Sequence, residues 1–198
     1  TRVWGELAPG DYYDERWERE WRSIARTIAW TVITTAKNRR LQPDDLLARI
    51  ASCGGEDLNL FLRVGAEIYQ LYQQQVETMG GLDFNGLLWS AVDMLEHHPD
   101  LCERLRTRWP IILEDEAQDS VPLQEDLLSM LGRGSANWVR VGDPNQAIMS
   151  TFTAADPRFL RRFLEMDSVR TVEMSISGRC APKIIEMANA LVQWVCFD

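Results

Sequence analysis

Paired cysteines are missing from this sequence. Its four cysteines, Cys53, Cys102, Cys180 and Cys196, are far apart and form no C-x-x-C pair, which argues against a zinc ribbon and against a disulfide framework. Long apolar runs are missing too, so we expect no membrane-spanning segment and no membrane partner. The chain also starts without a Met or a basic-then-apolar leader. These absences predict a cytoplasmic protein and an internal piece of a longer chain.

Positive charge is scarce. The sequence has 21 Lys and Arg against 30 Asp and Glu, which gives a net charge of −9 at pH 7. Such a balance disfavours nucleic-acid binding through a broad basic surface. Proteins that hold single strands partly by base stacking need less positive charge, so a nucleic-acid partner is not excluded. Apolar residues make up 45% of the chain, which is enough for a folded core.

The pattern of apolar residues changes near residue 80. Before this point they recur every three or four positions, which indicates helices; the stripe of the first helix is Trp17, Trp21, Ile24, Ile28 and Val32. After it, short apolar runs alternate with helical patterns, and these runs are residues 111–113, 138–141 and 170–174. Strands that alternate with helices predict a parallel sheet covered on both faces. We therefore expect an all-helical part over residues 1–80 and an α/β part over residues 81–198.

Carboxylates follow the first predicted strand directly. Ligands of parallel sheets bind beyond the carboxyl ends of the strands, so these side chains are expected in a crevice. Asp115 can hold a hydrated Mg²⁺, which takes one or two carboxylates, and Glu116 can polarise the water that attacks a γ-phosphate. The competing interpretation is an acidic turn in which Asp119 or Ser120 caps the next helix. A metal nuclease built on the acids Glu114, Asp115, Glu116 and Asp119 is disfavoured, because neither His nor Lys accompanies them in a recognisable arrangement.

Polar residues also follow the second and third predicted strands. Gly142 permits a close approach of the backbone, Pro144 stiffens the loop, and the amide of Gln146 can donate to a phosphate oxygen or orient water. Arg179 lies just before the closing helix, where its planar fork of donors can reach a phosphate. Taken alone, residues 142–146 are equally well explained as a tight turn without a ligand. Taken alone, Arg179 is more commonly a surface arginine near the start of a helix than a phosphate ligand.

The order of these segments resembles the UvrD/PcrA-like superfamily 1 helicases. Their Walker B motif, motif III and motif IV look like residues 112–120 (ILEDEAQDS), 142–148 (GDPNQAI) and 179–190 (RCAPKIIEMANA). Residues 82–88 (LDFNGLL) are similar to the helix that enters the family's first motor domain. The resemblance implies an α/β, helix-rich fold with a partial RecA-like (P-loop NTPase) parallel sheet. Residues 1–80 would be the end of a helical 1B-like subdomain, and residues 81–198 would run through domain 1A to the start of the second motor domain.

The resemblance also implies the chemistry. Asp115 would bind Mg²⁺, Glu116 would be the catalytic base, and Gln146 and Arg179 would contact the γ-phosphate of ATP. The family moves 3′ to 5′ on single-stranded DNA and separates the duplex ahead of it, often in DNA repair. The implied cofactors are therefore ATP and Mg²⁺, and the implied partner is single-stranded or duplex DNA.

Two departures concern the grip on DNA and on phosphate. Met149 stands where motif III has a stacking Tyr, while Phe152 remains as a base-stacking platform or, equally well, a core aromatic; these two are the DNA-contacting residues that the resemblance implies. No G-x-x-x-x-G-K-[ST] phosphate loop occurs in the 198 residues. In the family that loop precedes the helical insertion.

We therefore expect the complete protein to be an ATP-dependent DNA helicase and this chain alone to lack ATPase activity. In the family, the strand at residues 139–141 lies beside the strand that leads into the phosphate loop. Without that neighbour it would be an exposed sheet edge, which favours self-association. The alternative is a non-hydrolysing, helicase-like subunit that binds DNA or acts as a scaffold. The altered motif III favours this alternative, and Asp115, Glu116, Gln146 and Arg179 oppose it.

Overall fold

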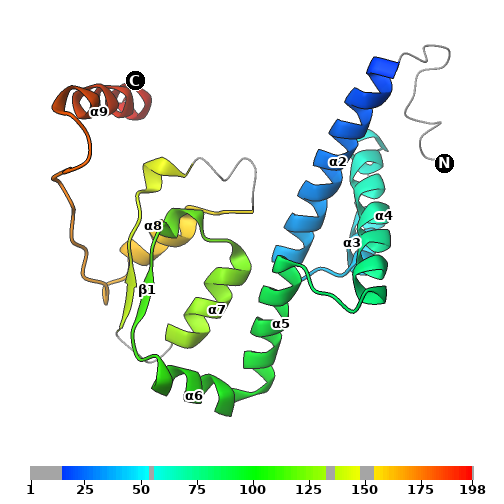
Figure 1. The fold of residues 1–198 in the computed structure, drawn as a ribbon, viewed down its shortest axis with the longest axis horizontal. Helices are drawn as coiled ribbons and strands as arrows, with labels where there is room; N and C mark the ends of the chain where they lie inside the picture. Colours follow the sequence, from blue (N-terminus) through cyan, green and yellow to red (C-terminus); the bar gives the residue numbers. More distant parts are fainter. Residues whose placement is uncertain (1–14, 54–55, 133–136, 148–153, 198) are drawn as a thin grey trace.

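The computed structural model describes residues 15–53, 56–132, 137–147 and 154–197, and it is helix-rich with one small parallel sheet (Figure 1). The elements in chain order are α2 (Glu15–Asn38), α3 (Pro43–Ser52), α4 (Glu56–Thr78), α5 (Phe84–His97), α6 (Pro99–Arg108), β1 (Ile112–Glu114), the 3₁₀ turn η1 (Ala117–Asp119), α7 (Pro122–Gly132), β2 (Trp138–Arg140), the 3₁₀ turn η2 (Pro144–Gln146), α8 (Arg158–Leu164) and α9 (Pro182–Phe197). This confirms the α/β, helix-rich class. None of the described helices is both long and apolar enough to cross a membrane.

Helices α2, α3 and α4 pack together around a small apolar core. Ile33 and Ala36 of α2 meet Tyr69 of α4, and all three are buried. A Cβ at Gly65 would lie 2.7 Å from Cγ2 of Val32, so the glycine lets α4 approach α2 closely. The core therefore holds the helical part together through α2 and α4.

The stripe predicted on the first helix is confirmed in part, because Trp21, Ile28 and Val32 are partly buried and the first two lie against Phe61 and Val64 of α4. The buried residues of α2 include Ala29, Ile33 and Ala36, whereas Ile24, predicted to face inward, is 49% exposed. Trp17 lies outside the residues whose side chains are described. Small residues that allow close helix contact were overlooked because the large apolar residues dominate the periodicity.

A buried ion pair joins the helical part to α5. Asp83, the N-cap of α5, accepts hydrogen bonds from Nζ of Lys37 at 2.7 Å, from the hydroxyl of Tyr72 at 2.7 Å and from the backbone N–H of Gly86 at 2.6 Å. The side chain of Lys37 is only 3% exposed. Burial alone would raise the pKa of Asp83, but these hydrogen bonds outweigh it and the pKa lies below its usual value. The contact fixes the start of α5 against α2 and α4.

The sheet consists of β1 and β2 in parallel, with α7 as the crossover between them. Leu113 is opposite Val139 in the register, and Glu114 is opposite Arg140. On one face, Trp138 packs against Phe163 of α8, with ring centroids 5.2 Å apart. On the other face, Leu113 is 76% and Val139 is 48% exposed. The predicted cover on both faces is therefore wrong for the described residues, because helices pack on one face only.

The covered face of the sheet holds a buried cluster of charges. Nε of Arg140 lies 2.7 Å from Oε2 of Glu114, and Nη2 lies 2.8 Å from Oε2 of Glu125 on α7. The side chain of Arg140 is fully buried. Burial raises the pKa of Glu125, although the arginine opposes the shift. The cluster ties β1, β2 and α7 together.

The third predicted strand, at residues 170–174, is wrong. This segment has no strand hydrogen bonds in the described structure, and its side chains are exposed. A strand needs a partner to bond its backbone groups, and the described part of the chain offers none there. Figure 1 shows the long connection that leads from α8 to α9. The division of the chain at residue 80 stays a prediction.

Candidate functional site

The carboxylates after β1 separate into two environments. Glu114 turns toward the covered face, where it pairs with Arg140 and accepts hydrogen bonds from the hydroxyl of Ser120 and from Nε1 of Trp138. Asp115 and Glu116 are exposed beyond the end of the strand. Glu114 is therefore a structural residue, and Asp115 and Glu116 are the carboxylates of this segment that are exposed to solvent.

The backbone of Glu116 has a left-handed conformation, with φ of 52° and ψ of 40°. Residues other than glycine rarely adopt it, and such strain persists where surrounding contacts hold it. The next N–H, that of Ala117, donates to the carbonyl of Val141 at 3.0 Å. The N–H of Glu116 itself donates to Oδ1 of Asp115 at 3.0 Å. These bonds fix a tight bend directly after β1.

Gln118 connects this bend to the loop after β2. Its side-chain amide donates to Oε2 of Glu116 at 2.7 Å, and its amide oxygen accepts the N–H of Asp143 at 3.1 Å. The residue is only 2% exposed. The two loops are therefore joined by a buried carboxamide.

The second loop is ordered by Asp143. Oδ1 of Asp143 accepts a hydrogen bond from the backbone N–H of Asn145 at 2.9 Å, and Oδ2 accepts one from Nε2 of Gln146 at 2.9 Å. Glu116 and Gln146 are both exposed at the surface and are connected through Gln118 and Asp143. The structure thus brings together two of the side chains that the resemblance assigns to ATP hydrolysis.

Arg179 is not part of this network. Its backbone N–H donates to Oγ of Ser177 at 3.3 Å, and no side chain of the described residues pairs with its guanidinium. It lies just before α9, which Figure 1 shows set apart from the helices that pack on the sheet. Of the other predicted residues, Met149 and Phe152 lie outside the described residues.

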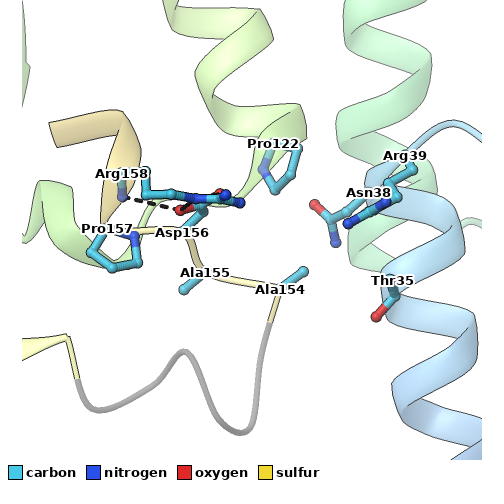
Figure 2. A pocket seen from close by; sticks show the side chains of 9 residues that line it. All are labelled: Thr35, Asn38, Arg39, Pro122, Ala154, Ala155, Asp156, Pro157 and Arg158. Atoms are coloured by element: carbon cyan, nitrogen blue, oxygen red, sulfur yellow. Dashed lines mark hydrogen bonds and ion pairs between the residues drawn. The ribbon is translucent and has the colours of Figure 1, made fainter. Parts of the chain in front are cut away.

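A cavity of about 370 Å³ lies between the end of α2 and the segment that leads into α8. Figure 2 shows Asn38 and Arg39 on one side, facing Pro122 and the Asp156–Arg158 pair on the other. Nη2 of Arg158 lies 2.6 Å from the carboxylate of Asp156, whose pKa is held below its usual value by this hydrogen bond. Glu116 and Gln146 do not line this cavity, so it is separate from the two-loop network.

The candidate site suits a hydrated metal ion better than an ion enclosed by protein. Among the described residues, no group of three or more His, Cys, Asp and Glu side chains is arranged to hold a metal. Mg²⁺ keeps several waters and takes only one or two carboxylates, and the exposed Asp115 can supply one. The turn of Glu114 toward Arg140 also opposes the metal nuclease considered from the sequence.

The central position of Gln118 in this geometry is not among the features predicted from the sequence. A signal was present in Gly142, which was expected to allow close backbone approach. A Cβ at this position would lie 2.5 Å from Oε1 of Gln118. The close approach therefore exists, but it accommodates a side chain of the protein.

Comparison with known proteins identifies the family. Residues 11–166 match the UvrD/REP helicase N-terminal domain. The chain is 29% identical over 161 residues to the ATP-dependent DNA helicase PcrA of Leuconostoc citreum, covering 81% of this chain and 21% of that protein. It is 30% identical over 178 residues to the ATP-dependent DNA helicase UvrD2 of Mycobacterium tuberculosis, covering 86% of this chain and 24% of that protein.

The chain is also 28% identical over 161 residues to DNA helicase II of Haemophilus influenzae, covering 81% of this chain and 21% of that protein. The chain thus spans between 21% and 24% of the length of these relatives. The match over residues 11–166 covers more than half of the chain. The chain therefore belongs to the UvrD/REP helicase family.

Proposed function

We propose that the protein containing these 198 residues is an ATP-dependent DNA helicase that moves 3′ to 5′ on single-stranded DNA. Membership of the UvrD/REP helicase family supports the activity. The observation that carries the proposal is the hydrogen-bonded path from Glu116 through Gln118 and Asp143 to Gln146. It holds a candidate base and a candidate phosphate contact at the same edge of a parallel sheet, where ligands of such sheets bind. In this proposal the sheet is part of a RecA-like domain.

The proposed division of labour follows from the positions of the side chains. Asp115 would hold Mg²⁺, which neutralises charge on the phosphates when it is bound. Glu116 orients a water molecule and takes its proton as the water oxygen attacks the γ-phosphorus, and ADP leaves with the bond electrons. Gln146 donates to a γ-phosphate oxygen. The exposure of Asp115, Glu116 and Gln146 supports these roles, because each can reach a ligand without rearrangement of the core.

Arg179 requires a rearrangement in this proposal. Its guanidinium is exposed and lies in a segment without regular structure. We propose that Arg179 reaches the γ-phosphate only when α9 is positioned by ATP and by the rest of the protein. The chain alone would then bind ATP poorly and hydrolyse none.

The test uses the complete protein encoded by the open reading frame. ATP hydrolysis is measured with and without single-stranded DNA, and strand separation is measured on duplexes with a 3′ or a 5′ single-stranded tail. We expect ATPase activity stimulated by single-stranded DNA and separation of the 3′-tailed duplex. DNA binding without any ATPase activity would instead identify the non-hydrolysing subunit. Separation of only the 5′-tailed duplex would contradict the direction.

A further inference from the structure

We propose that Gln118 is a positioning residue that sets the orientation of Glu116 according to the position of the loop after β2. The inference rests on the proposed function, because it concerns the ATPase step assigned to Glu116. Gln118 itself is not expected to touch ATP, since it is only 2% exposed. Its effect on catalysis would act through the carboxylate to which it donates.

The contacts of Gln118 require a carboxamide. The partner on one side is the carboxylate of Glu116, which accepts hydrogen bonds, and the partner on the other is the N–H of Asp143, which donates one. A side chain of this length must therefore offer a donor and an acceptor at once. Glutamate would present oxygens to both partners, and leucine would present nothing to either. The chemistry of the two partners also fixes which way round the amide lies.

Burial makes this bridge directional and stiff. Hydrogen bonds are stronger away from water, and a buried polar group that loses its partner is left with an uncompensated loss of hydration. The amide of Gln118 therefore cannot leave either partner cheaply. The backbone of Glu116 is held in the left-handed region, which fixes the position of its Cα–Cβ bond. The amide of Gln118 fixes the other end of the side chain, because it donates to the carboxylate. Both together restrict where its oxygens lie.

The backbone around the bridge leaves no spare room. A Cβ at Gly142 would lie 2.5 Å from Oε1 of Gln118 and 3.1 Å from the backbone nitrogen of Ala117. The loop after β2 thus packs directly on the bridging amide. A shift of this loop, for example when Gln146 engages a phosphate, moves the N–H of Asp143 and with it the amide that holds Glu116.

The experiment compares three variants of the complete protein. Gln118→Leu removes both hydrogen bonds, whereas Gln118→Glu retains an acceptor for Asp143 and loses the donor to Glu116. Gln124→Leu is the matched control, because Gln124 also accepts a backbone N–H, that of Val121 at 3.1 Å, but it is not part of the hydrogen-bonded path from Glu116 to Gln146. Steady-state ATPase gives kcat and KM, and hydrogen exchange with mass spectrometry reports the protection of peptides spanning residues 139–147. Thermal unfolding confirms that each variant is folded.

We expect Gln118→Leu to lower kcat about 10- to 100-fold, the range found when partners that orient site residues are removed, with KM for ATP changed less than about 3-fold. It should also speed exchange in the peptide that contains Asp143. Gln118→Glu should lower kcat similarly and keep that protection. Gln124→Leu should leave both readouts at their wild-type values. A fall in kcat in both Gln118 variants, with loss of protection in Gln118→Leu alone and no change in Gln124→Leu, would distinguish positioning from a general loss of stability.

Each other outcome has a defined meaning. Wild-type kcat in Gln118→Leu or in Gln118→Glu would overturn the positioning role. Unchanged exchange in Gln118→Leu would overturn the bridge itself. A KM effect without a kcat effect would overturn the role as well, because it would show that Gln118 serves binding and not the chemical step. Absence of ATPase activity in the wild-type protein would refute the proposed function, and with it the catalytic role of Gln118, while the exchange data would still show whether the bridge exists.

Discussion

Removal of the Asp83 carboxylate should strongly destabilise the chain. Asp83→Ala takes away the acceptor for Lys37, Tyr72 and the N–H of Gly86 at once. Because the side chain of Lys37 is only 3% exposed, an ammonium group would remain buried without its ion partner, at a cost of about 3–5 kcal/mol. Loss of the N-cap of α5 adds about 1 kcal/mol. The ring of Tyr72, whose centroid lies 5.3 Å from Nζ of Lys37, offsets a small part of this loss.

Urea unfolding of the 198-residue chain measures the effect. The double variant Lys37→Met/Asp83→Ala should be more stable than Asp83→Ala alone, because it no longer buries an unpaired charge. Glu67→Ala is the control, since its ion pair with Arg63 is largely exposed and is worth only about 0.3–0.5 kcal/mol. A loss below about 1 kcal/mol in Asp83→Ala would refute the reasoning, because such a loss is typical of a solvated surface pair.

The same carboxylate should contribute to acid sensitivity. Its pKa is lower in the folded chain than its usual value, so the unfolded chain binds a proton at this site more readily. The stabilisation is therefore complete above the unfolded pKa of about 4 and is lost as the pH falls through the lower folded value. Asp83→Asn should remove this part of the pH dependence of the free energy of unfolding. An equally steep loss of stability below pH 4 in wild type and Asp83→Asn would contradict the assignment.

Three further predictions follow from the sheet and its loops. Gly142→Ala, whose Cβ would lie 2.5 Å from the bridging amide oxygen, should lower the kcat of the complete protein about 10-fold or more, whereas Gly81→Ala, which has room for a Cβ, should not. Arg140→Met leaves Glu114 and Glu125 without their buried partner and should cost about 3–5 kcal/mol in urea unfolding. The 198-residue chain should self-associate in light scattering, because β2 has a neighbour on one side only in the described residues; a clean monomer would count against this.

The local parts of the fold were predictable from the sequence because they are encoded locally. The apolar runs at β1 and β2 and the polar residues directly after them predicted a parallel pair with ligand-binding loops. The structure has this pair, with Glu114 opposite Arg140 in the register. The crossover helix α7 belongs to the same class of feature. Each depends on a short stretch of sequence and little else.

The features that the sequence did not reveal depend on contacts between distant residues. The stripe predicted on α2 left out Ala29 and Ala36, which are buried because small residues pack where helices approach closely. The strand expected at residues 170–174 did not form because its apolar residues have no partner in the described structure. Gln118 was part of a recognisable motif, but its bridge to Asp143 became visible only when the two loops were placed side by side.

The most direct test of the account is the ATPase activity of Glu116→Gln in the complete protein. The substitution keeps the size of the side chain and removes the base, so kcat for ATP hydrolysis stimulated by single-stranded DNA should fall about 10²- to 10⁴-fold, while binding of ATP and DNA remains. Turnover within a few-fold of wild type would contradict the assignment of Glu116 as the group that activates water.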